Sequence, residues 1–277
     1  MIDMKYSVLI SVYCKENPEY LKLSIQSMVD QTLKPDEIVI VKDGKLTDEL
    51  DNIINEFLLI NSCLFTIVTL KKNVGLGLAL NEGLNACRNE LVARMDSDDI
   101  SLENRCELQC KEFEKNQRLS IVGTMTDEFF EEPNNVVTSR IVPTEHSEIL
   151  KFSRRRSPFN HPTVMYKKSE VIGCGGYHDV KRKEDIDLFA RMLNQGCIAM
   201  NIDKALLLFR SNEDNFKRRK SWENCVSYIN VIYNFWKKGY SRIDDLLFVT
   251  IGQVVMFLAP IWLLKLLSNS FLRKRKI

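Results

Sequence analysis

The chain has no pair of cysteines at the spacing that a structural zinc site or a disulfide framework requires. Its eight cysteines are scattered over 277 residues without a Cys-x-x-Cys motif, a distribution typical of reduced thiols in a cytosolic protein. The amino terminus lacks a basic segment followed by a small-residue cleavage site, so we interpret its first apolar run as a β-strand and not as a signal peptide. A hydrophobic content of 45% is sufficient for a folded core.

Internal repeats and low-complexity linkers are also missing, which favours one main domain over a string of modules. In the first hundred residues, segments typical of strands alternate with segments typical of helices. Their order is 6–13 (strand), 17–32 (helix), 37–42 (strand), 47–61 (helix), 65–70 (strand), 77–87 (helix) and 91–95 (strand). This alternation predicts an α/β fold with a Rossmann-like, mostly parallel sheet flanked by helices.

Beyond residue 100 the pattern is less regular. It predicts helices at 101–116, 144–152, 183–195 and 222–238, strands at 120–130, 136–141, 198–201 and 205–210, and a glycine-rich turn at 173–176. We therefore expect a main domain at 1–215 with halves that meet near residue 100. Residues 216–277 then form a helical carboxyl-terminal extension.

Three carboxylates occupy four positions directly after the predicted strand 91–95. These are Asp96, Asp98 and Asp99, with Ser97 between the first two. Like charges this close repel unless a cation lies among them. A hard divalent ion such as Mg²⁺ or Mn²⁺ prefers oxygen ligands of this kind. The alternative is a turn in which Asp and Ser bond their own backbone.

Polar residues also follow the other predicted strands of the first half. They are 14–16, 43–44, 71–75 and 96–99. Because the carboxyl ends of parallel strands meet at one edge of a sheet, these segments are expected to line one crevice. Carboxylates, amides, lysines and glycine-flanked backbone suit a phosphorylated, metal-bound ligand.

Several motifs together resemble family 2 glycosyltransferases. They are SVLISVY at 7–13, SMVDQT at 27–32, EIVIVKDG at 37–44, NVG at 73–75 with NEG at 81–83, MDSDD at 95–99 and ED at 184–185. Their order and spacing are most similar to those of bacterial enzymes that assemble O-antigen, capsule or exopolysaccharide, including the amylovoran type. The resemblance implies a GT-A fold, a UDP-sugar donor, a Mn²⁺ or Mg²⁺ cofactor and inversion at the anomeric carbon.

The resemblance also implies roles for individual residues. Asp43 would read uracil through its N3–H, Asp96 would lie near the ribose and the metal, Asp98 would bind the metal, and Asp99 would face the donor sugar. Asp185 occupies the position of the catalytic base, with Glu184 beside it. Further donor contacts are expected from Val12, Tyr13, Glu16, Asn73, Gly75 and Ser97.

Elementary chemistry supports a second acidic site. A carboxylate that binds a metal loses basicity, so a different group must accept the proton of the acceptor hydroxyl. Glu184 and Asp185 begin a predicted helix; on their own they could equally be first-turn acids stabilised by the helix dipole.

The chain departs from the family pattern at the segment where relatives carry Tyr-Arg-x-His. Here it reads FRSN at 209–212, so Asn212 replaces a metal-binding His, and Glu213 or Asp214 could assist. Lys42 also stands where an acid is common. A lone His in a turn such as Asn-His-Pro is more often structural than catalytic, and the resemblance implies at most an acceptor-side role for His161. Arg156 is a further acceptor-side candidate, and the basic clusters at 154–156, 181–183 and 217–220 are interpreted as solvated surface or as contacts to acceptor phosphate.

These features predict transfer of a hexose from a UDP-sugar to a lipid-linked saccharide. Galactose is the first choice for the transferred sugar, and N-acetylglucosamine or glucose is the next. Two alternatives stay open: a membrane-associated scaffold without activity, and a sugar-phosphate nucleotidyltransferase. The latter needs a glycine-rich loop after the first strand, and residues 11–15 contain no glycine.

Residues 246–264 carry no formal charge, and five basic residues with no acid lie in 265–277. One crossing would place the basic tail outside, against the positive-inside tendency. We therefore predict a kinked amphipathic or re-entrant segment within 244–277 on the cytoplasmic face of the bacterial inner membrane, with a buried core helix as the alternative. No nucleic-acid partner is expected, because the basic character is confined to this tail.

Overall fold

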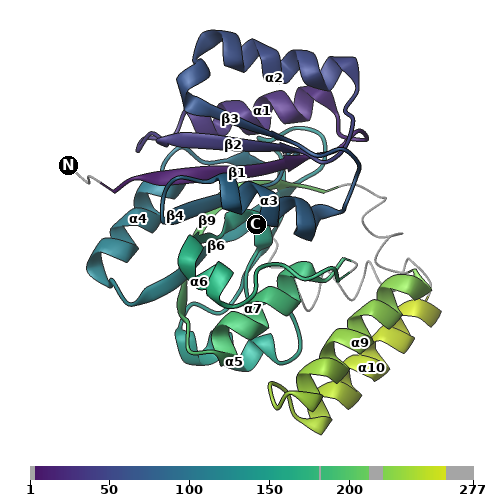
Figure 1. Cartoon of the computed structure of the whole chain (residues 1–277). Helices are drawn as coiled ribbons and strands as arrows, with labels where there is room; N and C mark the ends of the chain where they lie inside the picture. Colours follow the sequence, from purple (N-terminus) through teal and green to yellow (C-terminus); the bar gives the residue numbers. More distant parts are fainter. Residues whose placement is uncertain (1–3, 181, 212–220, 260–277) are drawn as a thin grey trace.

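The computed structural model describes residues 4–180, 182–211 and 221–259. Within them nine strands form one sheet in the order β3-β2-β1-β4-β8-β6-β9-β5, with β7 paired to β6 (Figure 1). The strands are β1 Tyr6–Val12, β2 Glu37–Lys42, β3 Phe65–Thr69, β4 Leu91–Met95, β5 Ile100–Ser101, β6 Leu119–Phe129, β7 Val136–Arg140, β8 Met165–Lys167 and β9 Ile198–Arg210.

The helices of the main domain lie between these strands. They are α1 Pro18–Val29, α2 Asp48–Ile60, α3 Leu76–Ala86, α4 Arg105–Lys115, α5 His146–Ser153, α6 Lys168–Gly173 and α7 Glu184–Asn194, with short 3₁₀ turns at Ser62–Leu64 and His161–Thr163. Two further helices follow, α9 Trp222–Lys237 and α10 Ile243–Leu258. The amide oxygen of Asn17 accepts hydrogen bonds from the first turn of α1, as the predicted N-cap requires.

The sheet is parallel in its first half and mixed in its second. β1 pairs with β2 and with β4 in parallel register, and β2 pairs with β3 in the same way. The second half adds antiparallel pairs of β8 with β4 and β6, and of β5 with β9, beside a parallel β6–β9 pair. The expected mostly parallel sheet is therefore confirmed for the first half, whereas antiparallel pairing extends the sheet beyond β4.

Helices cover both faces of the sheet. Alternate residues of β1 point to opposite faces. Val8 and Ile10 join the core beneath α1, α2 and α4, while Leu9 joins a second core beneath α3, α6 and α7. Gly83 of α3 permits a close approach on this second face, because a Cβ there would lie 2.3 Å from Leu9 Cδ1.

Two predicted boundaries in the second half are wrong. The helix expected from residue 101 begins at Arg105, because β5 first pairs with β9 and Leu102 donates its N–H to Leu206 O at 3.0 Å. The strands expected at 198–201 and 205–210 are one strand, β9. Its pairing with β6 shifts register between Thr124 and Met125, which pair with Ile202 and Ala205. The polar residues 203–204, which suggested a break between two strands, lie at this shift.

Helices α9 and α10 lie side by side and apart from the sheet (Figure 1). Their shared core contains Phe235 of α9 and Val249 of α10, and it reaches Ile186 and Ala190 on α7. Among the described residues, no helix combines the length and the apolar character needed to cross a bilayer. Residues 260–264 of the predicted apolar segment lie outside the described part of the chain.

Candidate active site

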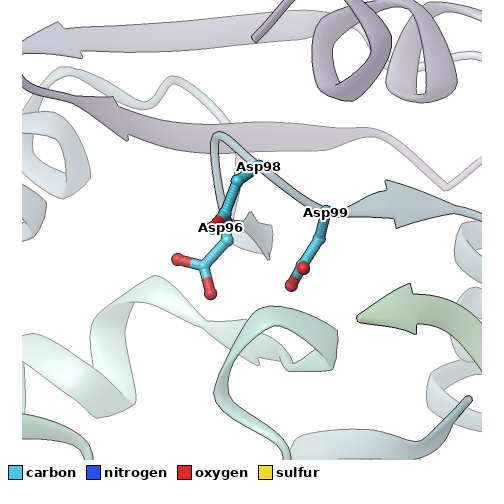
Figure 2. A group of neighbouring side chains, drawn as sticks. All are labelled: Asp96, Asp98 and Asp99. Carbon is cyan, nitrogen blue, oxygen red and sulfur yellow. The ribbon is translucent and has the colours of Figure 1, made fainter. Parts of the chain in front are cut away.

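The carboxyl end of β4 carries the acidic turn that the sequence predicts. Asp96, Asp98 and Asp99 each bring a carboxylate oxygen within 4.8 Å of those of the other two. Figure 2 shows that Asp96 and Asp99 project in the same direction from this turn. The central position of β4, between β1 and β8, fixes the turn at the middle of the sheet edge.

Hydrogen bonds from helix α1 and its preceding loop hold the acidic turn. Ser24 Oγ donates to the backbone oxygen of Asp96 at 2.7 Å, and Ser97 Oγ donates to Glu16 Oε2 at 2.5 Å. Ser97 is buried and Glu16 is partly buried. Both residues therefore lie at the predicted site, where Glu16 accepts a bond from the turn and adds negative charge beside it.

Arg210 at the end of β9 holds the other side of the turn. Its backbone N–H donates to Asp99 Oδ1 at 2.8 Å, and its Nε donates to Asp98 O at 2.9 Å. The guanidinium lies over the rings of Tyr20 and Phe129, with centroids 3.7 Å and 4.6 Å away. These contacts fix Arg210 between the two halves of the domain.

The electrostatics of the turn fit a hard divalent cation. Burial, with the charges of Asp96 and Glu16, raises the pKa of Asp98 to about 7. Burial and the neighbouring Asp98 and Asp96 also raise the pKa of Asp99 well above its usual value. Asp99 Oδ2 is buried and has no hydrogen-bond partner within the described residues. A cation bound by these oxygens would relieve both the repulsion and the unpaired atom.

Arg94 is a component of the site that the sequence motifs did not reveal. It belongs to β4, its side chain is 1% exposed, and its guanidinium forms an ion pair with Asp96. Burial lowers the pKa of Arg94, but the Asp96 carboxylate more than offsets burial and the pKa is raised overall. The signal available in the sequence was a single Arg within the apolar run 91–95. Its positive charge also lowers the pKa of Glu184, which brings the two predicted acidic sites into one electrostatic neighbourhood.

Asp43 links the end of β2 to the loop before α3. Its carboxylate accepts hydrogen bonds from Val74 N at 2.7 Å, Gly75 N at 3.1 Å and Asn73 Nδ2 at 2.9 Å. Its own N–H donates to Val12 O at 2.8 Å. The structure thus brings four of the predicted donor-binding residues together.

Two positions around Asp43 depend on backbone shape. Gly44 has a φ of +85°, and a Cβ there would lie 2.7 Å from Asn73 N, so a larger residue is disfavoured by both space and conformation. Gly75 also has a positive φ, +91°, as it opens α3. Tyr13, directly after β1, is 40% exposed.

Helix α7 begins with the second predicted acidic site. Burial and the neighbouring Asp185 raise the pKa of Glu184 to about 7. Asp187, in the same first turn, forms contacts within the protein. Its Oδ2 accepts a hydrogen bond from Arg191 Nε at 2.9 Å and lies 2.9 Å from His178 Nδ1. Glu184 and Asp185 precede Asp187 as the first two residues of α7.

His161 lies beside this site in the 3₁₀ turn before β8. Its Nε2 is 2.9 Å from the hydroxyl of Tyr177, and its ring packs edge-on against Phe189. Burial, with the charge of Arg94, holds the pKa of His161 well below its usual value, so the ring is neutral. Asn81 in turn holds Tyr177, because it accepts from Tyr177 N at 2.8 Å and donates to Tyr177 O at 2.7 Å.

Other predicted residues are farther from the chemistry or lie outside the described part. Arg156 places its guanidinium 4.9 Å from the ring centroid of Phe152. Arg155 is committed to Asp245, with its Nε 2.5 Å from the carboxylate. The proposed extra metal ligands Asn212, Glu213 and Asp214, the basic cluster 217–220 and residue 181 fall outside the described residues.

The model of Glycosyl transferase family 2 matches residues 7–177, a span that contains β1, Asp43, the acidic turn and His161. The chain belongs to this family. Residues 184–185 lie outside the matched span.

Curated relatives extend the likeness of this family 2 glycosyltransferase over most of its length. A UDP-Gal:alpha-D-GlcNAc-diphosphoundecaprenol beta-1,3-galactosyltransferase of Escherichia coli is 38% identical over 259 residues, which are 92% of each protein. The amylovoran biosynthesis glycosyltransferase AmsE of Erwinia amylovora is 36% identical over 226 residues, 82% of this chain and 84% of AmsE.

Solved structures share the fold of this glycosyltransferase at low identity. A mannosyltransferase of Pyrobaculum calidifontis in complex with GDP-Man and Mn²⁺ aligns with 94% of the chain and 72% of its own length, with a TM-score of 0.65 and 14% identity. TarS of S. aureus aligns with 97% of the chain at a TM-score of 0.64 and 17% identity, and the chain spans 46% of TarS. The predicted GT-A fold is confirmed.

Proposed function

We propose that this glycosyltransferase transfers galactose from UDP-galactose to N-acetylglucosamine on a diphosphate-linked polyprenyl lipid, with inversion at the anomeric carbon. The acidic turn of Asp96, Asp98 and Asp99 carries the proposal, because it offers hard oxygen ligands at the crevice of a GT-A fold. The name of the Escherichia coli relative supports the choice of donor and acceptor.

The donor would bind along the sheet edge from β2 to β4. Asp43 would contact the uracil, while Val12, Tyr13 and the Asn73–Gly75 loop surround the nucleoside. Asp98 and Asp96 would hold Mn²⁺ or Mg²⁺, and Ser97 with Glu16 would support the turn. When bound, the cation supplies Lewis-acid stabilisation of the diphosphate that departs. Asp99 would face the sugar from its buried position.

Asp185 would accept the proton of the attacking hydroxyl of the acceptor. The hydroxyl oxygen forms its bond to C1 of the sugar on the face opposite UDP, while the bond from C1 to the phosphate oxygen breaks and its electron pair stays on UDP. Glu184 beside it is the second candidate for this role, because its pKa of about 7 lies near physiological pH, as the pKa of an efficient general base does.

The acceptor would approach from the side of α7. His161, neutral and bonded to Tyr177, would face the saccharide, and Arg156 would lie toward its phosphates. A lipid-linked acceptor requires that the enzyme work at a membrane surface, and its nucleotide-sugar donor is cytosolic. We therefore place it as a peripheral or monotopic protein on the cytoplasmic face of the inner membrane.

A donor panel with a synthetic N-acetylglucosamine-diphosphate-lipid acceptor and Mn²⁺ tests the proposal. We expect transfer from UDP-galactose to exceed transfer from UDP-glucose or UDP-N-acetylglucosamine, and we expect a β-linked product. Asp185→Asn should lose roughly a hundredfold or more in turnover while UDP binding stays within twofold. The exposed Asp203 on β9 provides a matched control, Asp203→Asn.

Three results would count against the proposal. Preference for another nucleotide sugar would refute the assignment of galactose, and turnover by Asp185→Asn at the wild-type rate would move the base elsewhere. An α-linked product would refute inversion.

A further inference from the structure

Helix α10 turns its apolar side chains away from the protein. Five exposed apolar residues follow one another at helical spacing, so they form a single stripe. They are Leu247, Ile251, Val254, Val255 and Leu258, which we call the outer face of α10. Ile251 and Leu258 are 64% and 72% exposed, far more than a helix packed into a core would leave open.

The opposite side of α10 is packed and partly polar. Asp245, Val249 and Gln253 are buried there, and Val249 packs against Phe235 of α9. A surface helix of a globular protein usually turns its apolar stripe toward the core and its polar residues toward solvent, and α10 does the reverse. Within the described residues, the outer face of α10 is therefore exposed, in contrast to the buried core helix that was the alternative for this apolar segment.

Basic residues predominate at the turn between α9 and α10. The acids at the start of the helix, Asp244 and Asp245, are both paired with Arg155, at 3.7 Å and 2.5 Å. Lys237, Lys238 and Arg242 are exposed at the turn between α9 and α10. The sequence beyond residue 259 contains the apolar residues 261–264 and four basic residues at 273–276.

Exposed aromatic residues lie on the same pair of helices as the outer face. Trp222 of α9 is exposed, and its ring lies 5.1 Å from that of Phe257 on α10. Tyr233 and Trp236 of α9 are also exposed. Rings of this kind are favoured at the boundary between lipid and water.

We propose that the outer face of α10 lies on the surface of an anionic lipid bilayer, with the helix axis along the membrane plane. This inference rests on the proposed function for its biological setting, because a lipid-linked acceptor is found only at a membrane. α9 and α10 share their core with Ile186 and Ala190 of α7, the helix that begins with Glu184 and Asp185. The docked hairpin therefore holds the proposed base close to the membrane that presents the acceptor.

Flotation of the full chain with vesicles tests the docked face. The vesicles are phosphatidylcholine alone, or phosphatidylcholine mixed with phosphatidylglycerol. The variant Leu247→Ser/Ile251→Ser/Val255→Ser removes apolar area from the outer face without touching the contacts of Arg155. Leu59→Ser/Ile60→Ser is the matched control, because these side chains are 88% and 81% exposed near the end of α2, on the far side of the sheet from α10 (Figure 1).

We expect the wild type and the control to float with phosphatidylglycerol vesicles and to float less with phosphatidylcholine alone. The triple variant should lose roughly tenfold or more in partition coefficient while its melting temperature is unchanged. Equal partition of the triple variant and the wild type would overturn the proposal. So would a lipid-free wild type that is a dimer while the triple variant is a monomer, because the face would then bind a second copy.

Activity separates this inference from the proposed function. With a water-soluble acceptor analogue that carries a short alkyl chain, the triple variant should transfer galactose within twofold of the wild type. If neither protein transfers sugar, the proposed function fails while flotation still decides the docking surface. If the triple variant loses transfer to the soluble analogue, the outer face acts on the fold or the site and the docking role is refuted.

Discussion

Arg94 of β4 forms an ion pair with Asp96, the first residue of the acidic turn. The guanidinium is 1% exposed and the carboxylate 28% exposed, so the pair is largely shielded from solvent. Removal of one partner of such a pair leaves an unpaired charge in a poorly solvated position. Arg94 therefore compensates part of the charge of the turn within the protein itself.

Substitution of Arg94 should expose this dependence. We expect Arg94→Met to lower the free energy of unfolding by roughly 2–4 kcal/mol, measured by urea denaturation. In the double variant Arg94→Met/Asp96→Asn the loss should be smaller than the sum of the single losses by roughly 1–3 kcal/mol. Additive losses would show that the two side chains do not interact.

Asp43 should prove structural as well as ligand-binding. In Asp43→Asn, an amide N–H₂ replaces one of the oxygens that accept from Val74, Gly75 and Asn73. We expect the free energy of unfolding to fall by roughly 1–3 kcal/mol, with weaker UDP binding in calorimetry. The control Asp203→Asn should change neither quantity, and unchanged stability in Asp43→Asn would contradict the bonding described.

The stability of the protein should depend on pH through Glu184. Its folded pKa of about 7 is raised above the usual 4.5, so the native state disfavours the charged carboxylate. Stability linked to this group is fully present below the unfolded pKa and is lost as the pH rises through about 7. Glu184→Gln should therefore stabilise the protein by roughly 2 kcal/mol at about pH 8 and have little effect near pH 4.5.

Urea denaturation at the two pH values checks this difference. The exposed Glu114 on α4 offers the matched control Glu114→Gln, which should show no such pH dependence. A stabilisation equal at both pH values would mean that Glu184 does not titrate in this range.

Two glycines in helices should respond oppositely to alanine. At Gly83 a Cβ would lie 2.3 Å from Leu9 Cδ1 and 2.5 Å from Val41 Cγ2, whereas at Gly252 nothing lies within 4 Å. Gly83→Ala should destabilise the protein by roughly 1–3 kcal/mol, and Gly252→Ala should stabilise it by up to about 1 kcal/mol. Thermal unfolding distinguishes the two signs, and a neutral Gly83→Ala would show that α3 is not pressed against the sheet.

The nucleotide-binding half was predictable because its signals are local. The runs at 37–42 and 91–95 are apolar and end at acids, and the Asn17 cap marks a helix start, so each element could be recognised within a few residues. The rule that ligands lie at the carboxyl ends of parallel strands then placed Asp43 and the acidic turn together.

The second half was less predictable because its structure depends on distant pairing. β8 has three residues, Met165–Lys167, and it is a strand because β4 and β6 bond it from both sides. Arg94 and Arg210 were missed for a related reason. Arg94 appeared in the sequence only as a single Arg in an apolar run, two residues before Asp96, and Arg210 only as part of the FRSN segment. The stacking of Arg210 on Tyr20 and its hydrogen bond to Asp99 join segments that are far apart in the sequence.

The central claim is that a divalent cation held by Asp98 and Asp96 binds the diphosphate of the donor, and calorimetry of UDP binding tests it most directly. We expect the wild type and Glu114→Gln to bind UDP roughly tenfold or more tightly with Mn²⁺ than with EDTA. In Asp98→Asn this difference should disappear. Equal UDP affinity of the wild type in Mn²⁺ and in EDTA would contradict the account.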